Sequence, residues 1–155
     1  MTYQQTAALL QEHLDRSRFH QLFKPEVIRL DTELMTLAVK VKQNTTLERQ
    51  PDTGQWHGGA IAALVDIVGC YVLTIITPEP LPTMNFRTDF LRPAIGTDLV
   101  AEARIRQAGR TVGVVDVDIN SENRKLIAVG RGTYSMSPFS LEKQITPPSG
   151  TPAYD

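Results

Sequence analysis

The sequence has a single cysteine, no excess of basic residues and only three histidines among its 155 residues. One cysteine cannot form an intramolecular disulfide, so we expect a protein of the reducing cytoplasm. The 16 Lys and Arg residues against 17 Asp and Glu residues give a net charge of −1, which argues against general nucleic-acid binding. The histidines are dispersed, so we expect no metal site. The N-terminus lacks the basic and apolar stretches of a signal peptide, and none is expected.

The length suits one folded domain with a short segment on either side. A chain of this size can bury roughly 68–70% of its unfolded surface, which is enough for a core without disulfides or metals. Three leucines at helical spacing predict an amphipathic helix within an N-terminal segment, residues 1–24. Residues 25–140 form the predicted domain. Residues 141–155 are rich in proline and are predicted to be a flexible tail.

Residues 58–77 form the most apolar stretch and contain one ionisable acid or base, Asp66. A run this apolar could cross a membrane. A carboxylate is costly at the centre of a bilayer, however, and the flanks carry no basic cluster. We therefore expect a helix that is buried on nearly all sides inside the protein. The prolines at 78, 80 and 82 should end it.

Alternating apolar and polar residues predict six strands around this helix. Two precede the helix and four follow it, in residues 27–30, 33–42, 84–90, 99–106, 112–119 and 125–134. We expect the first turn at Asp31 and Thr32. Short turns between consecutive strands imply an antiparallel sheet, and one apolar helix against one face of it gives an α+β architecture.

Two glycines, Gly58 and Gly59, stand where the loop enters the helix. Glycine lets a ligand approach bare amides, which have no intrahelical partner there and lie at the positive end of the helix dipole. A carbonyl oxygen that gains negative charge would be stabilised at such a place. The alternative is that the two glycines only allow a tight turn.

Asp66 lies two turns into the helix, where a carboxylate must be paired, hydrogen-bonded or functional. It is the natural general base or nucleophile of a site that cleaves carbonyl compounds. The alternative is a structural hydrogen bond to a neighbouring strand. His57 could cap the helix as well as catalyse, and Cys70, one turn past Asp66, is interpreted as a core residue.

The run His57-Gly58-Gly59, followed by six residues and Asp66, with Gly54 three residues before the histidine, resembles the signature of the PaaI-type acyl-CoA thioesterases. These enzymes have the hotdog fold. The resemblance implies that the amide of Gly58 polarises the thioester carbonyl and that Asp66 is the general base or nucleophile. It also implies that His57 supports the geometry of the loop.

The similarity continues in the strand at residues 84–94 and in the turn at 107–110, and it runs from about residue 25 to residue 138. It implies a hotdog fold, in which an antiparallel sheet wraps around one long central helix. It also implies a homodimer or a dimer of dimers, with Gly58 of one chain facing Asp66 of the other. Thr83, early in the next strand, matches a hydroxyl that holds the attacking water or the carboxylate.

The chain departs from the family at Pro51, where an asparagine commonly shares the contact with the carbonyl. Proline has neither a side-chain donor nor a backbone N–H. Gln55 or the His57 side chain could substitute, or Gly58 could act alone.

The family places the coenzyme A phosphates against basic residues at strand ends and turns, although arginines on a sheet surface are often only solvated. The predicted substrate-binding residues are Gly59, Gln55, Trp56, Arg92, Arg110 and Arg131. Phe19, Leu22 and Phe23 could cover the acyl group, but packing against the domain is the simpler interpretation. No separate cofactor is expected, because coenzyme A is part of the substrate.

The leading hypothesis is an acyl-CoA thioesterase that releases a free acyl or aryl-acyl acid and coenzyme A. A hotdog dehydratase or hydratase is the first alternative, but it needs a paired histidine and carboxylate, and His57 lies at the helix entrance instead. A non-catalytic acyl-CoA-binding module is the second, and residues 1–24 are too short for an attached DNA-binding element. The expected partners are the acyl-CoA and further copies of this chain, with neither nucleic acid nor membrane. The sequence does not define the acyl group.

Overall fold

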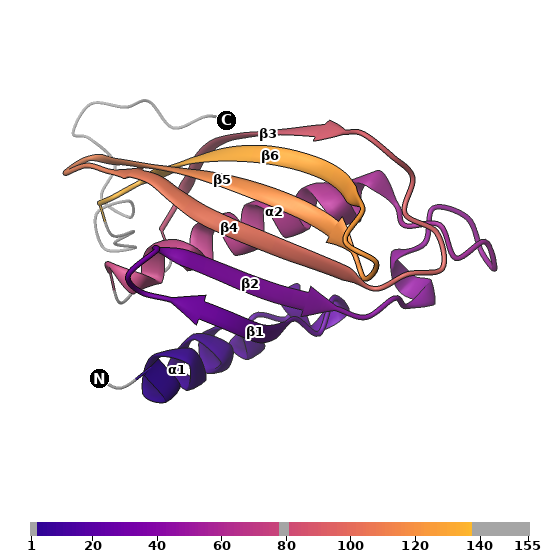
Figure 1. Ribbon diagram of the computed structural model, residues 1–155, viewed down its shortest axis with the longest axis horizontal. Helices are drawn as coiled ribbons and strands as arrows, with labels where there is room; N and C mark the ends of the chain where they lie inside the picture. Colours follow the sequence, from indigo (N-terminus) through magenta and orange to yellow (C-terminus); the bar gives the residue numbers. More distant parts are fainter. Residues whose placement is uncertain (1–2, 78–80, 138–155) are drawn as a thin grey trace, which may run out of the picture.

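The computed structural model describes residues 3–77 and 81–137 and consists of one antiparallel sheet wrapped around a long helix (Figure 1). The helices are α1 (Tyr3–Arg16), η1 (His20–Leu22), η2 (Thr45–Leu47), α2 (Gly58–Val72) and η3 (Leu73–Ile75). The strands are β1 (Glu26–Asp31), β2 (Thr36–Val41), β3 (Thr83–Phe90), β4 (Leu99–Ala108), β5 (Val112–Ser121) and β6 (Leu126–Ser135). The predicted tail, 141–155, lies outside the described residues.

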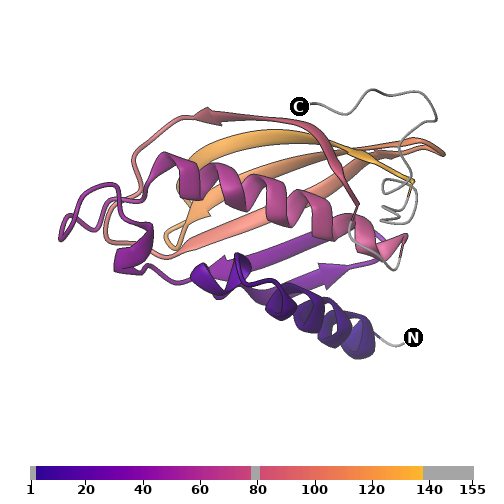
Figure 2. The ribbon, with the colours of Figure 1, turned by 180° about the vertical axis from the view of Figure 1, so that it is seen from behind.

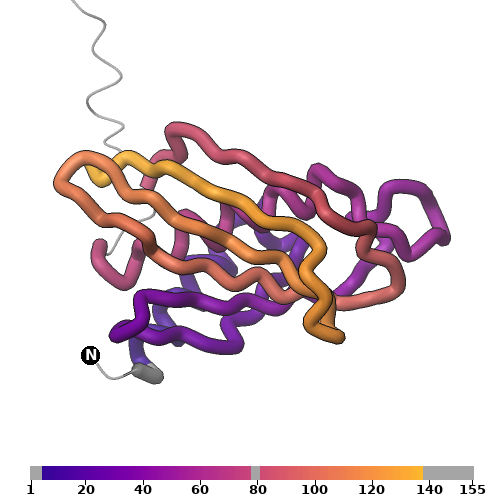
Figure 3. Tube along the Cα trace, turned by 45° about the horizontal axis from the view of Figure 1, so that its top comes forward, coloured from indigo at the N-terminus to yellow at the C-terminus, as the bar shows by residue number. Residues whose placement is uncertain are grey.

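The six strands form a single sheet in the order β1-β2-β4-β5-β6-β3, and every neighbouring pair is antiparallel. The chain enters α2 after β2 and returns to the far edge of the sheet as β3, so β1 and β3 are the two edge strands (Figure 3). The predicted order of two strands, one helix and four strands is confirmed, as is the antiparallel α+β architecture.

Helix α2 is the core of the fold because nearly every side chain along it is apolar. Leu64, Val65 and Val68 are fully buried against the sheet. Gly130 on β6 permits this approach, since a Cβ there would lie 2.4 Å from Val65 and 3.0 Å from the Arg87 carbonyl oxygen. The stretch Gly58–Ile75 is long and apolar enough to cross a bilayer, but 61% of it is buried inside the fold. The expected buried helix is therefore confirmed.

Helix α1 lies beside β1, as the view from behind shows (Figure 2). Leu10 and Leu14 are its buried side chains. The Gln11 side chain joins the helix to the sheet, because its amide donates to the Pro25 carbonyl at 2.8 Å and its oxygen accepts from the Val27 amide at 2.8 Å. The predicted N-terminal helix is confirmed.

Two predicted boundaries were wrong. The second strand begins at Thr36, because Asp31 accepts hydrogen bonds from the amides at 33 and 34 and Met35 has a positive φ of 54°, which together build a longer turn. The helix predicted for 58–77 is α-helical only to Val72 and continues as the short 3-10 helix η3. Alternation of side chains could not predict the length of the turn between β1 and β2, because its geometry depends on the Asp31 side chain as an acceptor.

Candidate active site

The entrance of α2 is capped by the side chain of His57. Its backbone is extended (φ −68°, ψ 133°), and its Nδ1 accepts a hydrogen bond of 2.9 Å from the Gly59 amide. Its carbonyl oxygen accepts from the amides of Ala60 and Ile61. Among the described residues, nothing accepts a hydrogen bond from the Gly58 amide. That amide therefore remains available at the positive end of the helix dipole.

A pocket of about 510 Å³ opens beside this amide. The structure brings five of the predicted site residues together along its lining: Gln55, Trp56, His57, Gly58 and Arg92. They come from the loop before α2, from the first residue of the helix and from the segment after β3. A helix entrance with a free amide and a neighbouring guanidinium can accept a carbonyl oxygen and an anionic group side by side.

Trp56 and Arg92 are both fixed in this pocket. Trp56 is buried, and its indole N–H donates to the Thr97 carbonyl at 2.8 Å, so it anchors the loop. Arg92 is exposed, and its Nη1 donates to the Leu126 carbonyl at 2.8 Å. The Arg92 guanidinium thus keeps further donors for a ligand.

Asp66 lines a second pocket, of about 500 Å³, which Gly59 also lines. The Thr83 hydroxyl donates a hydrogen bond of 2.7 Å to Oδ1 of Asp66 and orients the carboxylate. Cys70 lies in the same pocket, where burial raises the pKa of its thiol to about 11 and its Sγ donates to the Leu81 carbonyl. A thiol with a raised pKa is a poor nucleophile at neutral pH, so Cys70 is not a candidate for the chemistry.

Gly58 and Asp66 do not meet within one chain. They are eight residues apart on α2, which is about 12 Å along the helix axis at 1.5 Å per residue. Each lines its own pocket, and neither pocket contains both residues. A site that uses both groups on one substrate must therefore combine them from two chains.

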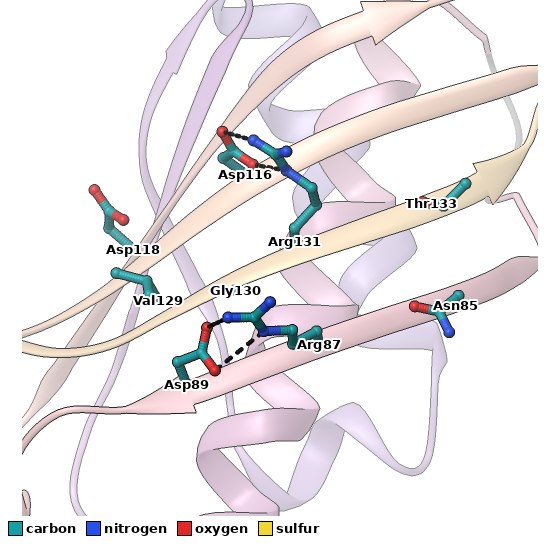
Figure 4. Close-up of a pocket in the computed structure, with 9 residues that line it drawn as sticks. All are labelled: Asn85, Arg87, Asp89, Asp116, Asp118, Val129, Gly130, Arg131 and Thr133. Atoms are coloured by element: carbon teal, nitrogen blue, oxygen red, sulfur yellow. Dashed lines mark hydrogen bonds and ion pairs between the residues drawn. The ribbon is translucent and has the colours of Figure 1, made fainter.

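Two predicted arginines lie away from both pockets. Arg110 is in the turn between β4 and β5, at the end of the molecule opposite the entrance of α2 (Figure 1). Arg131 is on β6, on the sheet face that points away from α2, and its Nε and Nη2 donate to Asp116 at 2.6 and 2.9 Å (Figure 4). Neither residue approaches the Gly58 amide within one chain.

The outer face of the sheet carries a larger hollow, of about 560 Å³, where Arg131 lies. Its charges are largely satisfied internally, since Arg87 also donates to Asp89 at 3.1 and 2.6 Å (Figure 4). Asp118 is the exception, and burial together with Glu102 and Asp116 raises the pKa of its carboxyl group. Among the described residues that line this hollow, no hydroxyl donates to a carboxylate as Thr83 does to Asp66, so we do not assign the chemistry to it.

Sequence reasoning did not assign Arg49 or His20 to a site. Arg49 lines the pocket of Gly58, and His20 lines the pocket of Asp66. Arg49 lies in the polar loop before α2. Its positive charge close in sequence to Gly58 and Gly59 was the one feature that could have predicted its place in this pocket. His20 is 46 positions before Asp66 in the sequence, and only the packing of the N-terminal segment against α2 brings them together. Among residues 3–77 and 81–137, no three histidine, cysteine or acidic side chains gather into a possible metal site.

A sheet wrapped around one central helix, with a carboxylate and a free amide presented by that helix, defines the hotdog class of thioester enzymes. The thioesterase superfamily model matches residues 53–128. A protein of Halobacterium salinarum that is named as an esterase is 30% identical over 138 residues, which cover 83% of this chain and 90% of that protein. The chain belongs to the thioesterase superfamily and is a thioester hydrolase.

Two further likenesses agree with this membership. The medium/long-chain acyl-CoA thioesterase YigI of Escherichia coli is 28% identical over 137 residues, which cover 75% of this chain and 83% of YigI. The structure of the Escherichia coli PaaI protein superposes with a TM-score of 0.70 at 21% identity and covers 84% of this chain and 94% of that one. The second likeness concerns the fold alone.

Proposed function

We propose that the protein hydrolyses acyl-CoA thioesters with Asp66 as the general base or nucleophile and the Gly58 amide as the donor to the carbonyl oxygen. The observation that carries this proposal is the carboxylate of Asp66, oriented by the Thr83 hydroxyl in a pocket lined mainly by apolar residues. An oriented carboxylate can take the proton of a water molecule that attacks the carbonyl, or attack it directly. The free Gly58 amide would then stabilise the oxyanion.

The complete site requires a homodimer, in which the pocket at Gly58 of one chain joins the pocket at Asp66 of the other. The apolar side chains on the open edge of the sheet support this arrangement. The edge strand β3 carries three apolar side chains that are largely open to solvent: Met84, Phe86 and Phe90 are 61%, 39% and 54% exposed. An uncovered apolar edge of this kind favours pairing with a second copy. A further pairing of dimers into a tetramer remains part of the proposal.

Arg49 and Arg92 are the groups that we assign to the phosphates of coenzyme A, because both line the pocket of the Gly58 amide. Arginine matches phosphate oxygens with paired donors. Arg110 and Arg131 could reach the coenzyme only from another chain of the assembly. The substrate would be a cytoplasmic medium- or long-chain acyl-CoA, a class that the named activity of YigI supports.

A panel of acyl-CoA thioesters tests the function, with the released coenzyme A measured by a thiol reagent. We expect release from at least one straight-chain thioester at a rate that is proportional to enzyme concentration. The second candidate is a hydratase, which needs a histidine paired with a carboxylate. His20 lines the pocket of Asp66 and could be that histidine. A 2-enoyl-CoA in the panel separates the two, since hydration consumes the double bond without releasing a thiol. No release from any thioester would refute hydrolysis.

Gln55 is the side chain best placed to replace the family's asparagine. It lines the pocket of Gly58, whereas Pro51 is exposed in the preceding turn and does not line that pocket. We expect Gln55→Ala to lower turnover by about tenfold, since a hydrogen bond to a charged group is worth about 1.5–3 kcal/mol at best. Gln50→Ala, in an exposed position of the same loop, is the matched control. If both variants retain full turnover, Gln55 makes no contact with the carbonyl oxygen, and the Gly58 amide holds it alone or with the His57 side chain.

A further inference from the structure

The N-terminal segment reaches into the pocket of Asp66. Ser17, Phe19 and His20, from the end of α1 to the start of η1, line one side of this pocket. The opposite side is formed by α2 and β3. The segment therefore contributes to the site on which the proposed function rests, although it precedes the sheet and belongs to no strand.

This side of the pocket is held rigidly against α2. The Tyr71 hydroxyl donates to the carbonyl of His13 in α1 at 3.2 Å. The His20 ring meets the Tyr71 ring edge to face, with centroids 5.4 Å apart at 76°. Phe19 packs in the same manner on the buried Phe23, at 5.5 Å and 61°. Such aromatic pairs stabilise one arrangement of the chain, so the segment is a fixed wall and not a loose flap.

The wall is chemically suited to a hydrocarbon. His20 Nδ1 lies 3.1 Å from the Leu14 carbonyl, which can only accept, so Nδ1 carries the proton in this contact. Burial lowers the pKa of His20 and favours its neutral form, although the Leu14 contact and Asp66 act in the other direction. An uncharged imidazole beside the Phe19 ring adds no cation to the pocket.

The facing side is built from small and apolar residues. Gly59, Ala62 and Ala63 lie on α2 and leave space in front of the helix, and Phe86 adds an aromatic face from β3. The oriented polar pair, Asp66 with Thr83, is the place where the thioester would lie. The volume of about 500 Å³ is within the roughly 300–1,000 Å³ of ordinary ligand pockets.

We propose that the Phe19–His20 turn is the wall of the acyl pocket that limits the length of the acyl chain, with Phe19 as the specificity-determining side chain. This proposal rests on the proposed thioesterase function and adds a residue from outside the sheet and α2. Phe19 is 54% exposed, so it stands at the mouth of the pocket, where the end of a chain longer than the pocket would meet it. Removing the ring opens the mouth, and enlarging it narrows the mouth.

The test is the chain-length profile of kcat/KM, from butanoyl-CoA to palmitoyl-CoA. For Phe19→Ala we expect the ratio of palmitoyl-CoA to octanoyl-CoA activity to rise about tenfold, because a few methylenes in an apolar pocket discriminate on that scale. Phe19→Trp should shift the ratio in the opposite direction. Leu9→Ala is the matched control, because Leu9 is an exposed apolar residue of the same segment that does not line the pocket. An identical chain-length profile in Phe19→Ala, Leu9→Ala and the unmodified protein would refute the proposal that Phe19 limits the length of the acyl chain.

Binding separates this outcome from a failure of the thioesterase proposal. In the Asp66→Asn background, calorimetry with the same acyl-CoA series reports the pocket without turnover. If the unmodified protein hydrolyses no thioester while Phe19→Ala still shifts the binding profile towards longer chains, the role of Phe19 is supported and only hydrolysis is refuted. If hydrolysis is present and Phe19→Ala changes neither the kcat/KM profile nor the binding profile, only the role of Phe19 is refuted. If there is neither hydrolysis nor a shift in binding, both proposals are wrong.

Discussion

Asp66→Asn is expected to lower turnover of the best acyl-CoA substrate by about 10²–10⁴-fold, which is the usual contribution of a general base. Asparagine has nearly the same shape but cannot take a proton from water or attack a carbonyl. Its side-chain oxygen can still accept the hydrogen bond that the Thr83 hydroxyl donates at 2.7 Å, so the pocket keeps its geometry. The measurement is kcat with saturating substrate, together with a thermal unfolding curve to verify the fold.

The matched control for this substitution is Asp52→Asn. Asp52 is exposed in the loop before α2 and has a φ of 61°, a conformation that asparagine adopts readily. It lines neither the pocket of Gly58 nor that of Asp66. Near-normal turnover is expected there. Should Asp66→Asn also turn over at close to the unmodified rate, the carboxylate would have only a structural role.

The arrangement of helices and strands could be predicted from the sequence because each element carries its own periodicity. The strand pattern around residues 112–119 places Val115, Val117 and Ile119 towards the core, and all three are fully buried. The run after Gly58 is apolar on nearly all sides, and its central carboxylate argues against a membrane span, so a buried helix is the expected structure. The turn ending at Met35 could not be predicted, because it depends on the carboxylate of Asp31, which accepts two backbone amides.

The candidate site was predictable only in part. The pairing of Thr83 with Asp66 was expected from the family resemblance, and the structure has that hydrogen bond. Arg131 was expected near the coenzyme but lies on the outer face beside Asp116. Its neighbour Gly130 faces Val65 of α2, and successive residues of a strand point to opposite faces. The position of His20 in the pocket of Asp66 could not be predicted, because periodicity describes one element at a time and not the packing of distant segments.

Gly58→Pro is expected to lower turnover by about 10²–10³-fold, the cost of removing one donor to an oxyanion. Proline deletes the amide proton and is well tolerated at the first position of a helix, which Gly58 occupies. His57 already has the extended backbone that a residue before proline requires, with ψ at 133°. Gly58→Ala keeps the amide, and its Cβ would lie 3.6 Å from the Phe90 ring, an ordinary contact, so its loss should be several-fold at most.

Mixing the two inactive chains decides whether Gly58 and Asp66 act across a dimer interface. After subunit exchange of Asp66→Asn with Gly58→Pro, half of the dimers are mixed, and each mixed dimer has one site with both groups intact. Recovery of about a quarter of the unmodified activity is therefore expected for a two-fold dimer. If both groups served the same site within one chain, every site would lack one of them and no activity would return. The separation of about 12 Å along α2 makes recovery the expected result.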